Sequence, residues 1–155
     1  MTGKIDARLT ALNIELPDAP APAANYVPFV LSGNLVFVSG QVPWVGGERN
    51  FVGKVGIDYT VDEGQDAART VALNIIAQVK AACDGDLDRV VQCIKLGGFV
   101  NCPDNFHQQP QVINGASDLM VDVFGDAGRH SRFAVGAPAL PFNVAVEIDA
   151  VFEVR

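Results

Sequence analysis

The sequence predicts an α+β domain in which two helices cover one face of a mixed β-sheet. Short runs of β-branched and aromatic residues are typical of strands, and two longer segments repeat apolar residues at helical spacing. These segments alternate in the order ββαβαββ, which favours two layers around one core. With 155 residues, 49% of them hydrophobic, the chain can bury a core without disulfides or metal. We therefore expect a single domain over 1–155.

An extra helix and a proline-rich arm are expected at about 1–24, before the first strand. Ile5, Leu9 and Leu12 follow helical spacing, which predicts a short amphipathic helix. Prolines are frequent from 17 to 28, and proline fixes φ and restrains the residue before it. This part of the chain is therefore expected to be extended.

The next signals predict a hairpin and a long helix. "YVPFVL" and "LVFVSGQVP" flank a Ser-Gly-Asn turn at 32–34. The glycine-rich stretch that follows indicates a loop or an irregular edge strand. Thr60 as N-cap and Glu63 three residues later predict a capping box, and the helix behind it has one apolar face.

The second half of the chain predicts a strand, a helix and two closing strands. The paired glycines in "RVVQCIKLGGFV" indicate a bulge or a close backbone approach. "CPDNFHQQPQVINGASDLMVDVFGDAG" contains a helix with Pro110 in its first turn and Gly125 or Gly128 at its end. "RFAVGA" and "NVAVEIDAVFEV" follow as strands. No helix remains to cover the other sheet face of so apolar a chain, and we expect a neighbouring subunit there.

Composition and charge argue against several functions. The net charge of −7 and the pI near 4.6 disfavour nucleic acid and anionic membranes as partners. The apolar stretches are too short for a membrane span or signal peptide, so we predict a cytoplasmic protein. Cys83, Cys93 and Cys102 form no C-x-x-C pair and are expected to be reduced thiols. His107 and His130 match no metal-binding pattern, and no metal is expected.

Arg132 and Glu147 are the most informative polar residues. Phe133 directly follows Arg132, which places the guanidinium inside a strand, where it needs an anion or a bidentate acceptor. Glu147 lies on the polar face of the last strand, which is either a solvated acidic face or, at Glu147, the wall of a pocket. If the last two strands formed a plain hairpin, Arg132 would pair with Glu147.

Three further residues leave alternatives open. His130 is either a general base or an incidental loop histidine. Tyr26 either covers the core or directs its hydroxyl into a site. Gly40 would let backbone amides approach a ligand, although the glycines match neither G-x-G-x-x-G nor a P-loop.

From about Asn25 to Val154 the sequence resembles the RidA/YjgF family of enamine/imine deaminases, formerly described as L-PSP endoribonucleases. The resemblance rests on "NYV", "LVFVSGQVP", "DNF", "VIN" and above all "SRFAVGAPALPFNVAVEIDAVF". It implies a chorismate-mutase-like fold, assembled as a homotrimer with a central barrel and clefts between subunits. It also implies that the last strand inserts between earlier strands, so that Arg132 and Glu147 meet across a cleft.

The resemblance also implies roles for individual residues. Arg132 would hold the carboxylate of a small 2-imino acid such as 2-iminopropionate, and Glu147 would hold or polarise the attacking water. The substrate-binding residues of the cleft would be Tyr26, Gly40, Phe106, Asn114 and, again, Arg132. The products would be a 2-keto acid and ammonia, and neither a metal nor an organic cofactor would be needed.

The chain departs from compact family members at a few positions. Ala139 replaces a second arginine, Ala134 replaces a cysteine, and Trp44 and Phe133 add bulk near the cleft. The phrases "AANYVP", "GKVG" and "INGASDL" are similar to those of a longer branch. One alternative function is a binding module for small carboxylated metabolites, regulatory or chaperone-like. A ribonuclease is less favoured, because the chain is acidic and poor in histidine.

Overall fold

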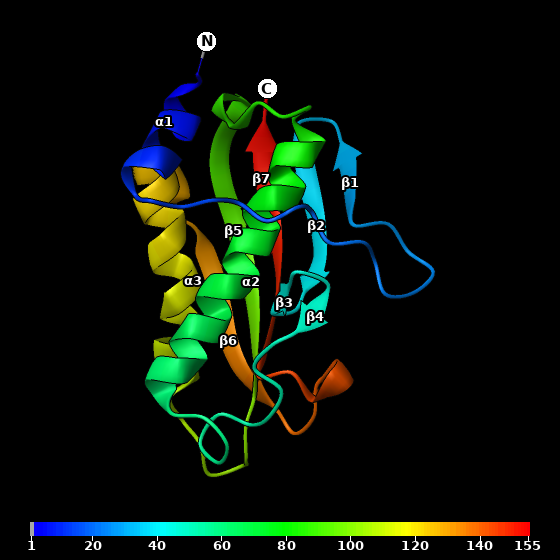
Figure 1. Ribbon diagram of the computed structural model, residues 1–155, viewed down its shortest axis with the longest axis vertical. Helices are drawn as coiled ribbons and strands as arrows, with labels where there is room; N and C mark the ends of the chain where they lie inside the picture. The colour runs from blue at the N-terminus through cyan, green and yellow to red at the C-terminus, as the bar shows by residue number, and fades with distance from the viewer. Residues whose placement is uncertain (1) are drawn as a thin grey trace.

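The computed structural model describes residues 2–155. Its helices are α1 (Lys4–Ala11), α2 (Val61–Ala82) and α3 (Gln109–Phe124), with 3-10 turns η1 (Leu87–Arg89), η2 (Gly125–Gly128) and η3 (Pro141–Asn143). Its strands are β1 (Phe29–Ser32), β2 (Leu35–Gln41), β3 (Trp44–Val45), β4 (Glu48–Arg49), β5 (Val90–Asn101), β6 (Ser131–Ala137) and β7 (Val146–Val154). α2 and α3 cover one face of the main sheet (Figure 1), as the sequence predicts.

The two large helices begin where their sequence signals lie. The backbone N–H of Glu63 donates to Oγ1 of Thr60 at 3.2 Å, and the N–H of Thr60 donates to Oε1 of Glu63 at 3.2 Å, which completes the predicted capping box. Pro110 lies in the first turn of α3, and Gly125 ends that helix with a φ of 63°. The helices approach closely at Gly115, where a Cβ would lie only 2.1 Å from the backbone oxygen of Gln65.

The main sheet is mixed and has the strand order β1-β2-β7-β5-β6. β6 pairs with β5 in parallel, and all other neighbours are antiparallel. β7 therefore lies between β2 and β5, so the expected insertion of the last strand is confirmed and the plain hairpin of the last two strands is wrong. The physical reason is that α3 forms the crossover that lets β6 join the sheet edge in parallel.

The paired glycines of β5 mark a close approach and not a bulge. The register shifts of β5 occur between Val90 and Gln92 and between Cys93 and Lys95. A Cβ on Gly97 would lie 2.3 Å from Oδ1 of Asp149 on the open sheet face, and one on Gly98 would lie 2.8 Å from the side chain of Ile113 in α3. Neither sheet face has room for a side chain at this point of β5.

The sheet face away from the helices exposes large apolar side chains. Phe37 on β2, Phe99 on β5 and Val135 on β6 are 45%, 39% and 42% exposed. Figure 1 shows no helix on that side of the sheet. This is the face for which the sequence predicted a covering subunit. Among residues 2–155, no helix has the length and apolar character needed to cross a bilayer.

The N-terminal segment reaches across the helical layer. α1 is fixed by Asp88, whose carboxylate accepts hydrogen bonds from the backbone N–H groups of Lys4 and Ile5, both at 2.8 Å. The proline-rich arm then passes in front of α2 toward β1 (Figure 1). It is attached there because the buried side chain of Gln78 donates to the carbonyl of Pro20 at 2.6 Å.

The glycine-rich stretch after β2 contains more regular structure than the sequence indicates. β3 and β4 form a small separate hairpin, with Trp44 opposite Arg49. The hairpin is held against α2 by the buried Asn74, whose side-chain amide donates to the carbonyls of Val42 and Trp44 at 3.0 and 2.9 Å. The positive φ angles of Gly46 and Gly47 form its turn.

Candidate functional site

A cavity of about 610 Å³ lies between the proline-rich arm, the end of β2, the β3–β4 hairpin, η3 and β7. We call it the Glu147 pocket. Tyr26, Gly40 and Glu147, three of the residues predicted from the sequence, all line it. The pocket therefore brings together residues that are more than 100 positions apart in the chain.

Glu147 provides the pocket's carboxylate. It projects from the open face of β7, opposite Phe99 of β5. A Cβ on Gly40 would lie 2.7 Å from Oε1 of Glu147, so glycine at this position leaves room for the carboxylate. Burial raises the pKa of Glu147 above its ordinary value, and the charge of the nearby Asp149 raises it further. The carboxyl group is thus more easily protonated than one in water, which suits a group that exchanges a proton.

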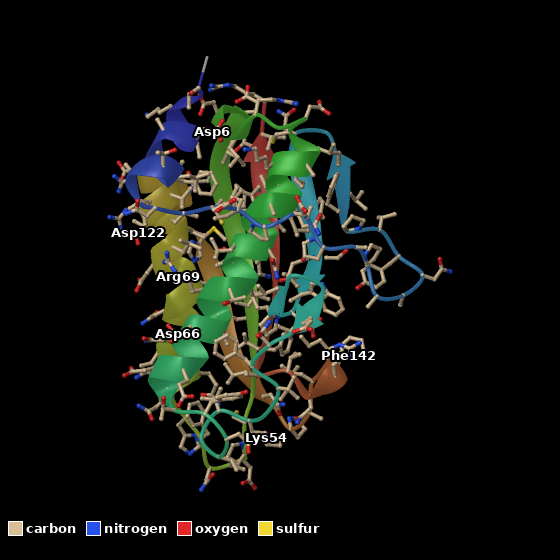
Figure 2. The ribbon with its side chains drawn as sticks, viewed as in Figure 1. Asp6, Lys54, Asp66, Arg69, Asp122 and Phe142 are labelled. Carbon is tan, nitrogen blue, oxygen red and sulfur yellow. The ribbon has the colours of Figure 1, made fainter. Side chains whose placement is uncertain are left out.

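A cation that the sequence analysis missed also lines the pocket. The guanidinium carbon of Arg49 lies 3.7 Å from the ring centroid of Phe142 and 5.5 Å from that of Trp44. Figure 2 shows Phe142 on η3, beside the β3–β4 hairpin. An arginine in a glycine-rich loop is usually solvated, and only its position five residues after a tryptophan hinted at this arrangement.

Arg132 lies outside this pocket and has neutral partners within its own chain. Its guanidinium donates to Oγ of Ser117 at 2.9 Å and to the carbonyl oxygen of Pro110 at 3.1 Å, both on α3. The sequence predicted an anion or a bidentate acceptor for this arginine, whereas its two acceptors within the chain are a hydroxyl and a carbonyl of different residues. Of its five N–H donors, these two bonds occupy two. The other three donors have no hydrogen-bond partner among residues 2–155.

His130 belongs to the same group of side chains. Its Nε2 lies 2.9 Å from Oγ of Ser117, and its Nδ1 lies 2.6 Å from the carbonyl oxygen of Gly128. Because a carbonyl oxygen only accepts, Nδ1 is the protonated nitrogen, and in the neutral ring Nε2 accepts from the Ser117 hydroxyl. Ser117 therefore links His130 to Arg132 and fixes the position of the guanidinium.

Two other predicted residues lie away from the Glu147 pocket. Asn114 occupies the turn of α3 between Pro110 and Ser117, on the side of the helix that faces Arg132. Phe106 precedes α3 and packs against Gly56, where a Cβ would lie 2.9 Å from the phenylalanine ring. We call Asn114, Ser117, His130 and Arg132 the Arg132 group.

The Glu147 pocket and the Arg132 group lie on opposite faces of the sheet. Arg132 pairs with Leu96, which is buried beneath the helices, whereas Glu147 pairs with Phe99 on the open face. β6 is also an edge strand, and β5 separates it from β7. Within one chain, then, Arg132 and Glu147 do not form a common site.

The described part of the chain offers few ligands for a metal. No cluster of three or more His, Cys, Asp or Glu side chains among residues 2–155 is arranged to hold an ion. Cys83, Cys93 and Cys102 are buried free thiols, as the sequence predicts. Burial raises the pKa of the Cys93 thiol to about 12, which makes it a poor nucleophile and a poor metal ligand.

Residues 6–153 match the model of the family described as "YjgF/chorismate mutase-like, putative endoribonuclease". The chain belongs to this YjgF family. A curated relative, "Protein TCP17" of Trypanosoma cruzi, is 51% identical over 157 aligned residues, which cover 99% of this chain and 96% of the relative. The resemblance inferred from "SRFAVGAPALPFNVAVEIDAVF" is thereby confirmed.

Solved structures of the YjgF family share the fold. Atu1372 from Agrobacterium tumefaciens, described as having unknown function, is 51% identical, with a TM-score of 0.91 over 97% of this chain and 92% of that one. The E. coli YjgF gene product is 26% identical, with a TM-score of 0.64 over 89% and 94% of the two chains. E. coli TdcF, solved with bound serine, is 26% identical, with a TM-score of 0.63 over 91% and 96%.

Proposed function

We propose that this chain forms a homotrimer that hydrolyses small reactive 2-imino and enamino acids to 2-keto acids and ammonia at clefts between subunits. The main support is the separation of the two groups of site residues. A second copy that places its β6 edge against the Glu147 pocket of the first would complete a site with both Arg132 and Glu147. In a closed ring of such contacts, each subunit would contribute to two clefts.

The exposed apolar face of the sheet supports the same assembly. Phe37, Phe99 and Val135 form a surface that a monomer would leave in water. We propose that the three sheets pack these faces around a central barrel. The single domain over 1–155 would be the unit that assembles, with the N-terminal helix and arm outside the barrel.

The proposed reaction needs only water and positioned side chains. The water oxygen bonds to the imine carbon while one water proton passes to the imine nitrogen, which gives a carbinolamine. The hydroxyl proton of the carbinolamine then passes to nitrogen as the C–N bond breaks, so that the C–N electron pair leaves with nitrogen as ammonia and the keto C=O bond forms. Because the C=N carbon is already electrophilic, orientation and charge stabilisation are sufficient, and no metal or organic cofactor is invoked.

Each residue has a defined part in this reaction. Arg132 holds the substrate carboxylate with the donors that Ser117 and Pro110 leave free. Glu147 accepts the proton of the attacking water and returns it to the leaving nitrogen, for which its raised pKa is suited. Tyr26 and Gly40 shape the cleft from one subunit, and Asn114 and Phe106 from the other.

The test is to replace Arg132 with alanine and to measure turnover of enzymatically generated 2-iminopropionate. We expect kcat/KM to fall about 100-fold or more, with an unchanged sedimentation coefficient, because a charged hydrogen-bonded contact is lost. Arg129→Ala is the matched control, since Arg129 is exposed and its only ion pair within residues 2–155 is to Asp126, at 3.4 Å. Unchanged turnover in the Arg132 variant would refute the mechanism.

A binding module is the second candidate, because the relative TdcF was solved with serine bound. In that case the same clefts would hold a carboxylated metabolite without converting it. Calorimetry with 2-keto acids beside the deaminase assay separates the two, since binding without turnover favours the module. The net charge of −7 disfavours ribonuclease activity and nucleic-acid partners. We propose the cytoplasm as the location, in keeping with three free thiols.

A further inference from the structure

We propose that the Glu147 pocket selects 2-imino acids with an aromatic side chain, whose ring binds between the proline-rich arm and the stacked Arg49 and Phe142. This inference rests on the proposed function, because it names the substrate class of the same site. It concerns the arm, the β3–β4 hairpin and η3, and not the residues that perform the hydrolysis.

The size of the pocket supports a bulky ligand. Its volume of about 610 Å³ lies in the range of about 300–1,000 Å³ that holds drug-sized molecules. An imino acid with three carbons would leave most of this space to water. An imino acid that carries an aromatic ring on its third carbon would fill far more of the pocket.

One wall of the pocket is apolar and fixed in place. The arm contributes the small apolar run from Pro20 to Ala24. Gln78 holds the start of this run through its hydrogen bond to Pro20, and the backbone N–H of Ala23 donates to the hydroxyl of Tyr26 at 3.4 Å. The proline and alanine side chains from Pro20 to Ala24 have no polar group with which to bind a polar ligand side chain.

Another part of the pocket lining is aromatic and positively charged. The Arg49 guanidinium lies over the Phe142 ring at 3.7 Å, and within residues 2–155 it forms no ion pair or hydrogen bond. Arg49 is exposed, and the Trp44 ring centroid lies 5.5 Å from its guanidinium carbon. A ligand ring in contact with this guanidinium would add a cation–π contact that aliphatic or cationic side chains cannot make.

The backbone of η3 is held in a strained conformation that presents Phe142. Phe142 and Asn143 have φ angles of 60° and 58°, which non-glycine residues seldom adopt. Asn143 is held by the side-chain amide of Asn101, which donates to its Oδ1 at 3.1 Å, and by the N–H of Gly53, which donates to its carbonyl at 2.7 Å. Phe142 remains 44% exposed, so the strain does not bury the ring. Such strain is typical of residues that contact a ligand.

The residues that line the pocket therefore fall into two chemical groups. Glu147 and Gly40 form a polar group suited to the reacting C=N bond. Arg49, Trp44 and Phe142 form an aromatic group suited to the side chain. An imino acid that carries a phenyl or indole group matches both groups.

The experiment compares two imines, generated from phenylalanine and from alanine by an amino-acid oxidase. We expect kcat/KM to favour the phenylalanine-derived imine by about tenfold or more. Phe142→Ala should remove most of this preference, and Arg49→Met should reduce it. Phe142→Leu keeps apolar bulk without a ring and guards against misfolding. Arg69→Ala, which changes an exposed arginine of α2 (Figure 2), is the matched control.

Calorimetry with the unreactive keto acids phenylpyruvate and pyruvate separates the two proposals. If neither imine is hydrolysed but phenylpyruvate binds more tightly and loses this advantage in Phe142→Ala, the proposed function fails and the aromatic subsite stands. If the alanine-derived imine is hydrolysed as well as the other, and the two keto acids bind equally, the subsite is refuted and the proposed function stands. A preference that survives in Phe142→Ala, Phe142→Leu and Arg49→Met would also refute the subsite.

Discussion

Along β7, alternate residues face two different environments. Val146, Ile148, Ala150, Phe152 and Val154 face the helices and are at most 4% exposed, whereas Glu147, Asp149 and Glu153 face the open side. The helix-covered face is a closed apolar core, and the open face combines carboxylates with exposed rings. The difference indicates that folding of the single chain depends on the first face, and we propose that assembly and chemistry depend on the second.

Arg132 departs from this division. It projects from β6 on the helix-covered side, yet the proposed chemistry needs it together with Glu147 on the open side. A contact between edges of neighbouring subunits removes the conflict, because the two residues then need not belong to the same chain.

The largest expected effect is on stability, at the core of the helix-covered face. Phe152→Ala should lower the free energy of unfolding by about 3–5 kcal/mol, since it opens a cavity at a fully buried position. Urea denaturation at several protein concentrations would measure it. Phe99→Ala on the open face is the matched control. Its loss of unfolding free energy should depend on protein concentration, because Phe99 is proposed to pack against a neighbouring subunit. Equal, concentration-independent losses would contradict the difference between the faces.

A charge on the open face should affect assembly before it affects folding. Phe37→Asp places a carboxylate on the proposed contact surface, so we expect trimers to dissociate into folded monomers. Analytical ultracentrifugation would follow the mass, and far-UV circular dichroism would follow the helix content. A wild-type protein that is monomeric at micromolar concentration would contradict the proposed assembly.

Glu147→Gln should have a smaller effect on stability, and the effect should depend on pH. The raised pKa of Glu147 means that the folded chain binds this proton more tightly than the unfolded chain does. The charged carboxylate therefore destabilises the wild type, a cost absent below the ordinary carboxyl pKa and complete above the raised one. The variant should gain in Tm relative to the wild type as pH rises through that window. A constant difference in Tm would contradict this, and turnover should be lost at every pH.

The smallest expected effect is the reaction of thiol reagents with Cys93 in the folded protein. Cys93 lies on the helix-covered face with a pKa raised to about 12, so its thiol should not react in the folded protein. A colorimetric thiol assay should detect the Cys93 thiol only in urea, and mass spectrometry of labelled peptides would identify the site. Labelling of Cys93 under native conditions would show that the core opens far more often than its packing indicates.

Local signals in the sequence were sufficient to predict the three α-helices and the strands of the main sheet, but not the β3–β4 hairpin. The capping box at Thr60, the proline in the first turn of α3 and the alternation along β7 each depend on residues a few positions apart. Strand order was not available from such signals, because the position of β7 depends on contacts between distant segments. The resemblance to a known family implied that the last strand inserts between earlier strands, whereas a plain hairpin of the last two strands was the wrong pairing.

The site was predicted in part for similar reasons. Tyr26, Gly40 and Glu147 do line one pocket. Arg49 was missed because its role depends on stacking over Phe142. The position of the Phe142 ring depends in turn on the left-handed backbone of η3, and the sequence "LPFN" does not predict that conformation. The acceptors of Arg132 were also missed, since Pro110 and Ser117 belong to a helix whose packing on β6 is a property of the fold.

The central position of β7 also constrains the order in which the protein can fold. β2 and β5 are not neighbours in the sheet, and only β7, which pairs with both, joins them. During synthesis, the hairpin of β1 and β2 and the unit of β5, α3 and β6 must therefore wait, with unpaired strand edges, for the final strand to leave the ribosome. We expect slow folding with a high contact order, and a strong dependence on chaperones for any variant that delays the pairing of β7.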